Sequence, residues 1–251
     1  MSKSDEQNNS DNGHPSLYFP FVQEENRLSM AMENYLHSIL RLRERSVKVT
    51  VANLAEHFKN LPSSEGLGTS IPSVSAMIRR LSREKLVQIN PTKEIDFTTL
   101  GLQLANGIVR RHRLAERLVV DLLGVDLKYA YSEAHRLEHA ISPYLEHRII
   151  EILKHPTRCP FGHPIPGTNY VADENLVTLN LAVSDRGYII DRIPEDDVEL
   201  LDYFVKNDFL PGSEIIIKDN SESRGVITIS VDNKDIFLSM EVSQLIWICP
   251  N

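Results

Sequence analysis

Apolar residues recur at helical spacing in the first part of the chain and at strand spacing in the last part. Residues 29–45, 49–59 and 72–85 place an apolar side chain every three or four positions. This period predicts amphipathic helices, whereas strict alternation predicts strands. Residues 177–183 begin a series of short alternating runs, interrupted by one helical stretch at 196–206. We therefore expect helices first and a small β-barrel last.

A short hairpin follows the first three predicted helices. Strands at 86–89 and 95–98 flank a tight turn, and the connection at 60–71 is long and rich in Ser, Gly and Pro. Helix, connection, helix and hairpin in this order are typical of a winged helix-turn-helix, whose second helix enters the DNA major groove. The pattern therefore predicts a DNA-binding domain.

The third predicted helix carries the candidate DNA contacts. Its small N-terminal residues would face base edges, and its arginines would bind phosphates. A helix with an ordinary solvated basic face is the alternative, and the hairpin that follows favours DNA. An alanine touches a thymine methyl but cannot hydrogen-bond a base, so no operator sequence is predicted. The candidates are Ser70, Pro72, Ser73, Ser75, Ala76, Arg79 and Arg80.

Side chains of metal-ligand type cluster on two further predicted helices. His112 and Glu116 are four positions apart on the first, and His135, Glu138 and His139 are three and four apart on the second. Such spacings put side chains on one helix face, and two helices can build one metal site. Imidazole with carboxylate suits transition metals better than Mg²⁺ or Ca²⁺. For either group of residues taken by itself, the alternative interpretation is an ordinary solvent-exposed His/Glu pair on a helix.

Local signals set the bounds of these two helices. The first spans residues 99–123 and ends at Gly124, a common terminator. We expect Ser132 to cap the second, because serine is a favoured N-cap. A further helix at 144–154 follows, and the apolar surface of all three predicts a homodimer.

Composition limits the possible partners. The 251 residues carry 27 basic and 35 acidic side chains, for a net charge of −8. This excludes a uniformly basic nucleic-acid binder but permits one basic face. Two cysteines cannot build a disulfide scaffold, and no apolar run is long enough to cross a membrane. We expect a cytoplasmic protein with no membrane partner.

Three blocks of sequence, at residues 110–118, 133–139 and 159–167, occur in an order that resembles the diphtheria-toxin-repressor family of metal-activated transcriptional regulators. The resemblance extends from about residue 29 to the C-terminus. It implies a winged-helix domain, a helical metal-binding and dimerisation domain and, as in the longer members, an SH3-like barrel. The implied partners are a palindromic operator in double-stranded DNA and a second copy of the chain.

The resemblance also implies how the ligands group. Family members have a thioether or a carboxylate at the position of Asn34, and a cysteine or a glutamate at that of His135, so neither the iron nor the manganese pattern is reproduced. We expect Mn²⁺ or Fe²⁺, with Zn²⁺ as an alternative. The primary site would use Asn34, His135, Glu138 and His139, and the second would use His112 and Glu116 with His37 or a barrel carboxylate.

The second site departs from the family pattern in two respects. Tyr131 stands where iron-type members have a ligand histidine. Near the barrel helix, where longer members complete this site, Glu195, Asp196 and Glu199 are the candidates, in a register shifted by two extra residues. A solvated acidic helix N-terminus is the alternative for each of them.

We expect a mainly α protein with an α+β part. The divisions are a disordered tail (1–27), a winged helix (28–100), a helical metal and dimerisation domain (101–155), a proline-rich linker (156–175) and an SH3-like, FeoA-like domain (176–251). In the linker, Cys159 and His163 support a zinc site only weakly, because no second Cys/His pair lies nearby.

The pattern predicts a metal-dependent transcriptional regulator, most simply a repressor of metal-homeostasis genes, and no enzyme. A metal that joins Asn34, before the recognition helix, to ligands after it would set the angle between the domains. One alternative is a winged-helix protein that ignores metal. The other is a zinc peptidase, since residues 135–139 match H-x-x-E-H.

Overall fold

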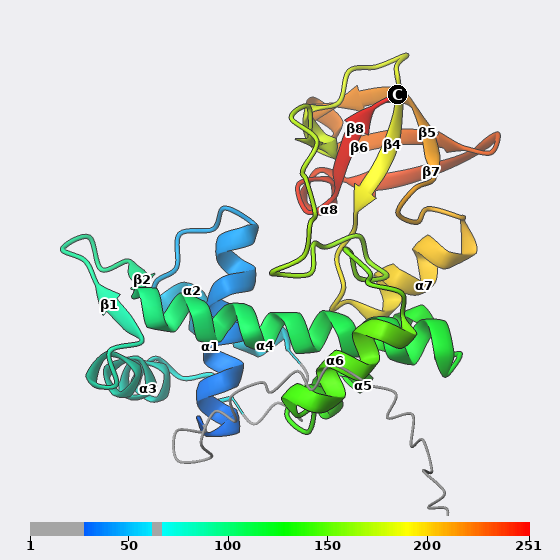
Figure 1. Cartoon of the computed structure of the whole chain (residues 1–251). Helices are drawn as coiled ribbons and strands as arrows, with labels where there is room; N and C mark the ends of the chain where they lie inside the picture. Colours follow the sequence, from blue (N-terminus) through cyan, green and yellow to red (C-terminus); the bar gives the residue numbers. More distant parts are fainter. Residues whose placement is uncertain (1–27, 62–66) are drawn as a thin grey trace, which may run out of the picture.

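A long central helix joins the parts of the molecule (Figure 1). The computed structural model describes residues 28–61 and 67–251. The predicted disordered tail at 1–27 therefore lies outside the described residues, as does part of the connection between the second and third helices. In the described ranges, no helix is both long and apolar enough to cross a membrane.

The winged helix-turn-helix is formed as predicted. Its helices are α1 (Met30–Glu44), α2 (Val51–Asn60) and α3 (Ile71–Arg83). The wing pairs β1 (Val87–Ile89) with β2 (Ile95–Phe97) in antiparallel register. The side chains of Ser29, Thr50 and Ser70 accept hydrogen bonds from backbone amides of the first turns, so these three polar residues cap the helices. One apolar core, including Leu36, Leu54 and Ile78, fills the space between the three helices.

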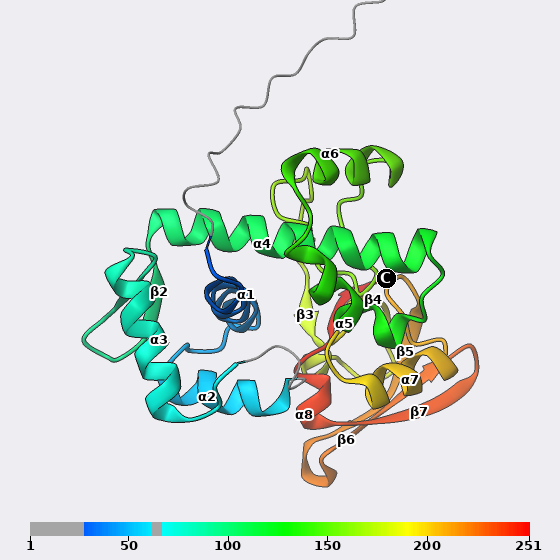
Figure 2. The same ribbon diagram turned by 90° about the horizontal axis from the view of Figure 1, so that it is seen from below.

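Helix α4 (Thr99–Arg117) carries the winged helix at its N-terminal end and the metal region toward its other end (Figure 2). It continues as one wider π-turn, Leu118–Leu122, before Gly124 ends it with a φ of 68°. The predicted terminator is therefore confirmed. The last residues of the predicted α-helix, Leu118–Leu122, form a π-turn instead of an α-turn.

Helix α5 (Leu127–Glu138) begins five residues before the predicted cap. The prediction for Ser132 was wrong: this residue lies inside the helix, and its hydroxyl donates to the carbonyl of Tyr129. The helix extends upstream because Ala130 and Tyr131, which precede Ser132, are buried on its packed face. Helix α6 (Pro143–Ile152) follows, with Ser142 as N-cap.

The C-terminal domain is a six-stranded antiparallel sheet with strand order β3-β8-β4-β5-β6-β7. The expected strand at 177–183 is corrected to two residues followed by a 3₁₀ turn (179–181), and the last helix and strand were not predicted. Helix α7 begins at Val198 rather than at the predicted residue 196, and Asp197 is its N-cap. The elements are β3 (Val177–Thr178), β4 (Gly187–Arg192), α7 (Val198–Lys206), β5 (Glu214–Ser221), β6 (Val226–Val231), β7 (Lys234–Ser239), α8 (Met240–Ser243) and β8 (Trp247–Pro250).

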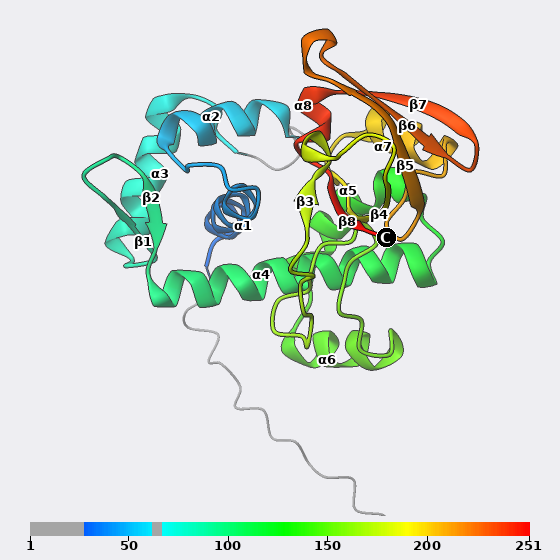
Figure 3. The same cartoon turned by 90° about the horizontal axis from the view of Figure 1, so that it is seen from above.

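The proline-rich linker is held on α4 rather than suspended between domains. Three arginines of α4, one turn apart, donate to its carbonyls: Arg110 to Pro166, Arg113 to Pro164 and Arg117 to Arg158. Cys159 and Phe161 of the linker are buried. Helix α6 and the sheet domain lie on opposite sides of α4 (Figure 3).

We predict that Gly101→Ala destabilises the protein by about 2 kcal/mol, the middle of the range for overpacking. A Cβ at Gly101 would lie 1.8 Å from the backbone oxygen of Leu86, where α4 meets the strand that opens the wing. Because this neighbour is backbone, the wing itself must move. Thermal or denaturant unfolding measures the loss.

Gly107→Ala, on the same helix, is the matched control. The nearest atom to its added Cβ is the flexible end of Arg111, at 3.9 Å. Helix propensity should therefore stabilise this variant by up to about 1 kcal/mol. Equal effects of the two substitutions would contradict the packing at Gly101.

Candidate metal centre and DNA interface

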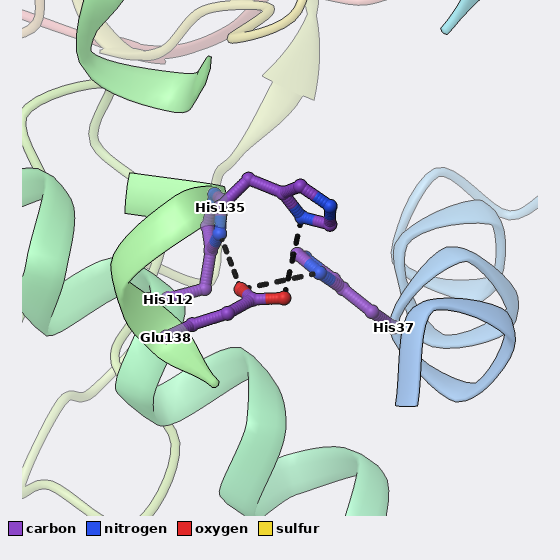
Figure 4. Close-up of side chains that lie close together, drawn as sticks. All are labelled: His37, His112, His135 and Glu138. Atoms are coloured by element: carbon purple, nitrogen blue, oxygen red, sulfur yellow. Dashed lines mark hydrogen bonds and ion pairs between the residues drawn. The ribbon is translucent and has the colours of Figure 1, made fainter. Parts of the chain in front are cut away.

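Four buried side chains from three helices converge on one point (Figure 4). They are His37 of α1, His112 of α4, and His135 and Glu138 of α5, and one ligand atom from each lies within 4.8 Å of the others. Figure 4 shows the Glu138 carboxylate between the three imidazole rings. We call these four residues the first cluster.

Glu138 is the centre of the first cluster. Its Oε2 lies 2.6 Å from His112 Nδ1 and 3.7 Å from His37 Nδ1. Its Oε1 lies 3.3 Å from His135 Nδ1 and 3.3 Å from His139 Nε2. Among the described residues, Glu138 Oε1 and His135 Nδ1 make no hydrogen bond although both are buried. Buried nitrogen and oxygen atoms that lack a hydrogen bond fit a divalent transition metal.

Helix α1 closes this site from the side of the DNA-binding domain. Asn34 Nδ2 lies 3.5 Å from His135 Nε2. Together with His37, Asn34 brings two side chains of α1 against α4 and α5, and both are buried. The structure thus places side chains from before and after the recognition helix side by side.

Glu33 is a residue that the sequence analysis missed. Its Oε2 lies 2.6 Å from His139 Nδ1, and its Oε1 accepts from Arg111 at 3.2 Å. A carboxylate bonded to one ring nitrogen of a histidine sets the tautomer and the ring orientation, and the other nitrogen of His139, Nε2, lies toward Glu138. No local pattern points to Glu33, because neighbouring positions on a helix do not share a face and His139 lies far along the chain.

The first cluster is electrostatically prepared for a cation. Burial lowers the pKa of His112, but Glu116 and Glu138 outweigh this effect and raise it to about 10. Burial lowers the pKa of His37 to about 4, despite the attraction of Glu138. Burial also opposes the charge on Glu138, yet His37 and His112 hold its pKa well below its ordinary value. At neutral pH, His112 therefore carries a proton whose place a metal can take.

A second cluster lies behind the first. Glu116 of α4, Cys159 of the linker and Glu195 of the sheet domain are all buried, with ligand atoms within 4.8 Å of one another. Glu116 Oε2 and Glu195 Oε2 have no hydrogen-bond partner within the described ranges. His112 Nε2 lies 3.1 Å from Glu116 Oε1, so this histidine joins the two clusters.

The thiol and the histidine of the linker both enter this region. Burial raises the pKa of Cys159 well above its ordinary value, and Glu116 and Glu195 add to the rise. Without a metal the thiol stays protonated, whereas a bound metal stabilises the thiolate. His163 Nε2 lies 3.4 Å from Glu195 Oε2. The zinc interpretation of Cys159 was weak in sequence because its neighbours come from other domains.

The remaining candidates take different positions. Tyr131 accepts a hydrogen bond from Arg41 at 2.9 Å, and its ring centroid lies 4.9 Å from that of His112. Asp196 pairs with Arg41 at 3.1 Å. Glu199 is exposed on the first turn of α7 and belongs to neither cluster.

Helix α3 presents the predicted DNA-binding face. Its inward side chains, Val74, Ile78 and Leu81, are fully buried. A hollow between α3 and the wing is lined by Ala76, Arg79, Ser82, Arg83 and Ile89. Ser75 is half-buried, and the other candidates are exposed: Ser70, Pro72, Ser73, Ala76, Arg79 and Arg80.

Three family descriptions match successive parts of the chain. Residues 27–95 match the N-terminal DNA-binding domain of iron-dependent repressors, and residues 98–167 match their metal-binding and dimerisation domain. Residues 177–250 match the FeoA domain. The domain boundaries that we assign between these matches stay a prediction.

Whole relatives are similar along nearly their full length. The diphtheria toxin repressor of Corynebacterium diphtheriae is 32% identical over 227 residues, which cover 86% of this chain and 95% of the relative. The iron-dependent repressor IdeR of Mycobacterium leprae is 30% identical over 89% of this chain and 98% of its own. A manganese-dependent transcriptional repressor solved in complex with manganese superposes with a TM-score of 0.77 and 30% identity, over 88% of this chain and all of its own. The chain therefore belongs to the iron-dependent repressor family, which includes the diphtheria toxin repressor.

Proposed function

We propose that this protein is a cytoplasmic, homodimeric repressor whose binding to a palindromic DNA operator depends on a divalent metal, Mn²⁺ or Fe²⁺, with Zn²⁺ as an alternative. One observation carries the proposal: side chains of α1, α4 and α5 converge on the buried carboxylate of Glu138. Helix α1 belongs to the part that matches the DNA-binding domain, and α4 and α5 belong to the part that matches the dimerisation domain.

The first cluster would hold the metal, together with the neighbouring side chains of Asn34 and His139. His135, Glu138 and His139 are close together on the end of α5 and can gather without movement between domains. Asn34 and His37 come from α1, so they bind only when α1 lies against α5. The positive charge of a bound metal would favour this closed arrangement. If DNA binds the same arrangement, the metal would also raise the DNA affinity.

The donor types guide the choice of metal. The first cluster offers imidazole nitrogens and one carboxylate, which suit Mn²⁺, Fe²⁺ and Zn²⁺. The second cluster adds the sulfur of Cys159, a softer donor that favours Fe²⁺ or Zn²⁺. We propose the second cluster as an additional metal site formed by Glu116, Cys159 and Glu195.

We propose no catalytic role. In the peptidase interpretation of residues 135–139, the glutamate is a general base that must reach water and substrate. Here the Glu138 side chain is fully buried and surrounded by imidazoles. A winged-helix protein that ignores metal is the second alternative, with the histidines as structural partners of Glu138.

A mobility-shift experiment separates these possibilities. The probe is DNA from upstream of the protein's own gene, tested with Mn²⁺, Fe²⁺, Zn²⁺ or a chelator. We expect at least one metal to strengthen binding and the chelator to reverse it. Binding that is equal in metal and chelator would contradict the proposal and favour the metal-independent alternative.

We predict that Arg80→Ala weakens binding to all DNA sequences about equally. Arg80 is exposed on the last turns of α3, where it can reach phosphate but not base edges. Losing one phosphate contact should reduce the slope of log binding constant against log salt concentration by about one unit. Arg224→Ala, which removes an exposed arginine of the sheet domain, is the control. An unchanged slope for Arg80→Ala would contradict this placement of α3.

A further inference from the structure

Arg41 is a buried arginine of α1 that neither metal cluster uses as a ligand. Its side chain is 3% exposed. Its Nε lies 2.6 Å from Glu195 Oε1, and its Nη2 lies 3.1 Å from Asp196 Oδ2. Its Nη1 donates to the Tyr131 hydroxyl at 2.9 Å. One guanidinium thus contacts α5 and the segment before α7 while it belongs to the DNA-binding domain.

Arg45 reinforces this contact one turn later on α1. Its Nη2 lies 3.3 Å from Asp196 Oδ1, so both oxygens of Asp196 face arginines. Both acidic residues before α7, Glu195 and Asp196, therefore face arginines at the C-terminal end of α1.

The contact between α1 and the sheet domain is closely packed. The cavity at this contact measures about 10 Å³ and is lined by Arg41, Arg45 and Glu195 among others. That volume holds at most one water molecule. The Arg41–Glu195 pair is shielded from solvent; charge-assisted hydrogen bonds of this kind are strong, and arginine holds carboxylates in a fixed geometry.

The apolar cores do not join α1 to the sheet domain. Val119 and Ala130, from the α4–α5 region, share one core with Phe204 and Ile215 of the sheet domain. The apolar core of α1 to α3 is a separate cluster. The sheet domain and α5 therefore form one apolar body, and α1 meets the sheet domain through charged side chains.

We propose that Arg41 and Arg45 form an ionic latch that holds the DNA-binding domain against the sheet domain through Glu195 and Asp196. The guanidinium of Arg41 lies beside Glu195, which is also a member of the second cluster. The latch would therefore favour the same arrangement of α1 against α5 that a bound metal would strengthen further. This inference goes beyond the proposed metal regulation and does not depend on it.

A distance measurement in the full-length protein tests the latch. Spin labels are placed at Glu56→Cys on α2 and Lys234→Cys on β7, both exposed positions, in a Cys249→Ser background. Pulsed electron resonance is recorded in chelator, without DNA, on labelled protein diluted with unlabelled protein. We expect one narrow distance distribution for the parent and a broad one for Arg41→Met.

Arg43→Met is the matched control, because Arg43 lies on the same helix but contacts Asp96 of the wing. It should keep the narrow distribution. A broad distribution in the chelated parent, or a narrow one in Arg41→Met, overturns the latch. If circular dichroism shows that Arg41→Met does not fold, the double variant Glu195→Gln, Asp196→Asn replaces it. A broad distribution in this variant is then expected, and a narrow one overturns the latch. Neither metal nor DNA is present, so failure of the latch is distinct from failure of the proposed function.

Discussion

Glu138→Gln is expected to lower metal affinity by more than about 100-fold, beyond the 10- to 100-fold losses seen when supporting residues around a metal are changed. Glutamine keeps the size of the side chain but removes the carboxylate that all the imidazoles of the first cluster face. The imidazoles are neutral donors when they bind metal, so the site would lose its charge complement to a divalent cation. Isothermal calorimetry with Mn²⁺ measures the change.

Glu133→Gln is the control for this prediction. Glu133 lies on the same helix, is exposed, and pairs with Arg136 at the surface. It should leave metal affinity unchanged. Thermal unfolding of both variants without metal confirms that the fold is retained. If Glu138→Gln binds Mn²⁺ as tightly as the parent protein, Glu138 is not the centre of the site.

The double variant Asn34→Ala, His37→Ala is expected to bind metal but to lose most of the metal-dependent gain in DNA affinity. His112, His135 and Glu138 remain in the first cluster, and His139 stays beside Glu138. The two changed residues are the candidate ligands from α1, so the link to the DNA-binding domain is lost. Typical coupling between two sites predicts a loss of about 5- to 150-fold in that gain.

Two measurements on the same protein isolate this coupling. Calorimetry gives the metal affinity, and mobility shifts with metal and with chelator give the gain in DNA affinity. His147→Ala is the control, because His147 lies on α6 and pairs with Glu151 outside both clusters. A double variant that retains the full metal-activated gain would show that α1 does not transmit metal binding.

Much of the fold could be predicted because its signals are local. Helical periodicity located α1 to α3, and Ser29 and Thr50 cap their helices because an N-cap bonds amides two or three residues away. Gly124 ends the helical stretch for a similarly local reason. The Ser132 prediction failed because the buried face of α5, which packs on α4, extends the helix beyond a local capping signal.

The sequence by itself determined which side chains share a helix face: the spacing of His135, Glu138 and His139 fixes their common direction. Only the tertiary structure decided what meets that face. It brought His37 and Glu33 from α1, about a hundred residues earlier, and it set Cys159 beside Glu116 and Glu195. The physical reason is that helix geometry orients side chains over one or two turns, whereas the approach of separate helices and domains depends on the packing of their whole apolar surfaces.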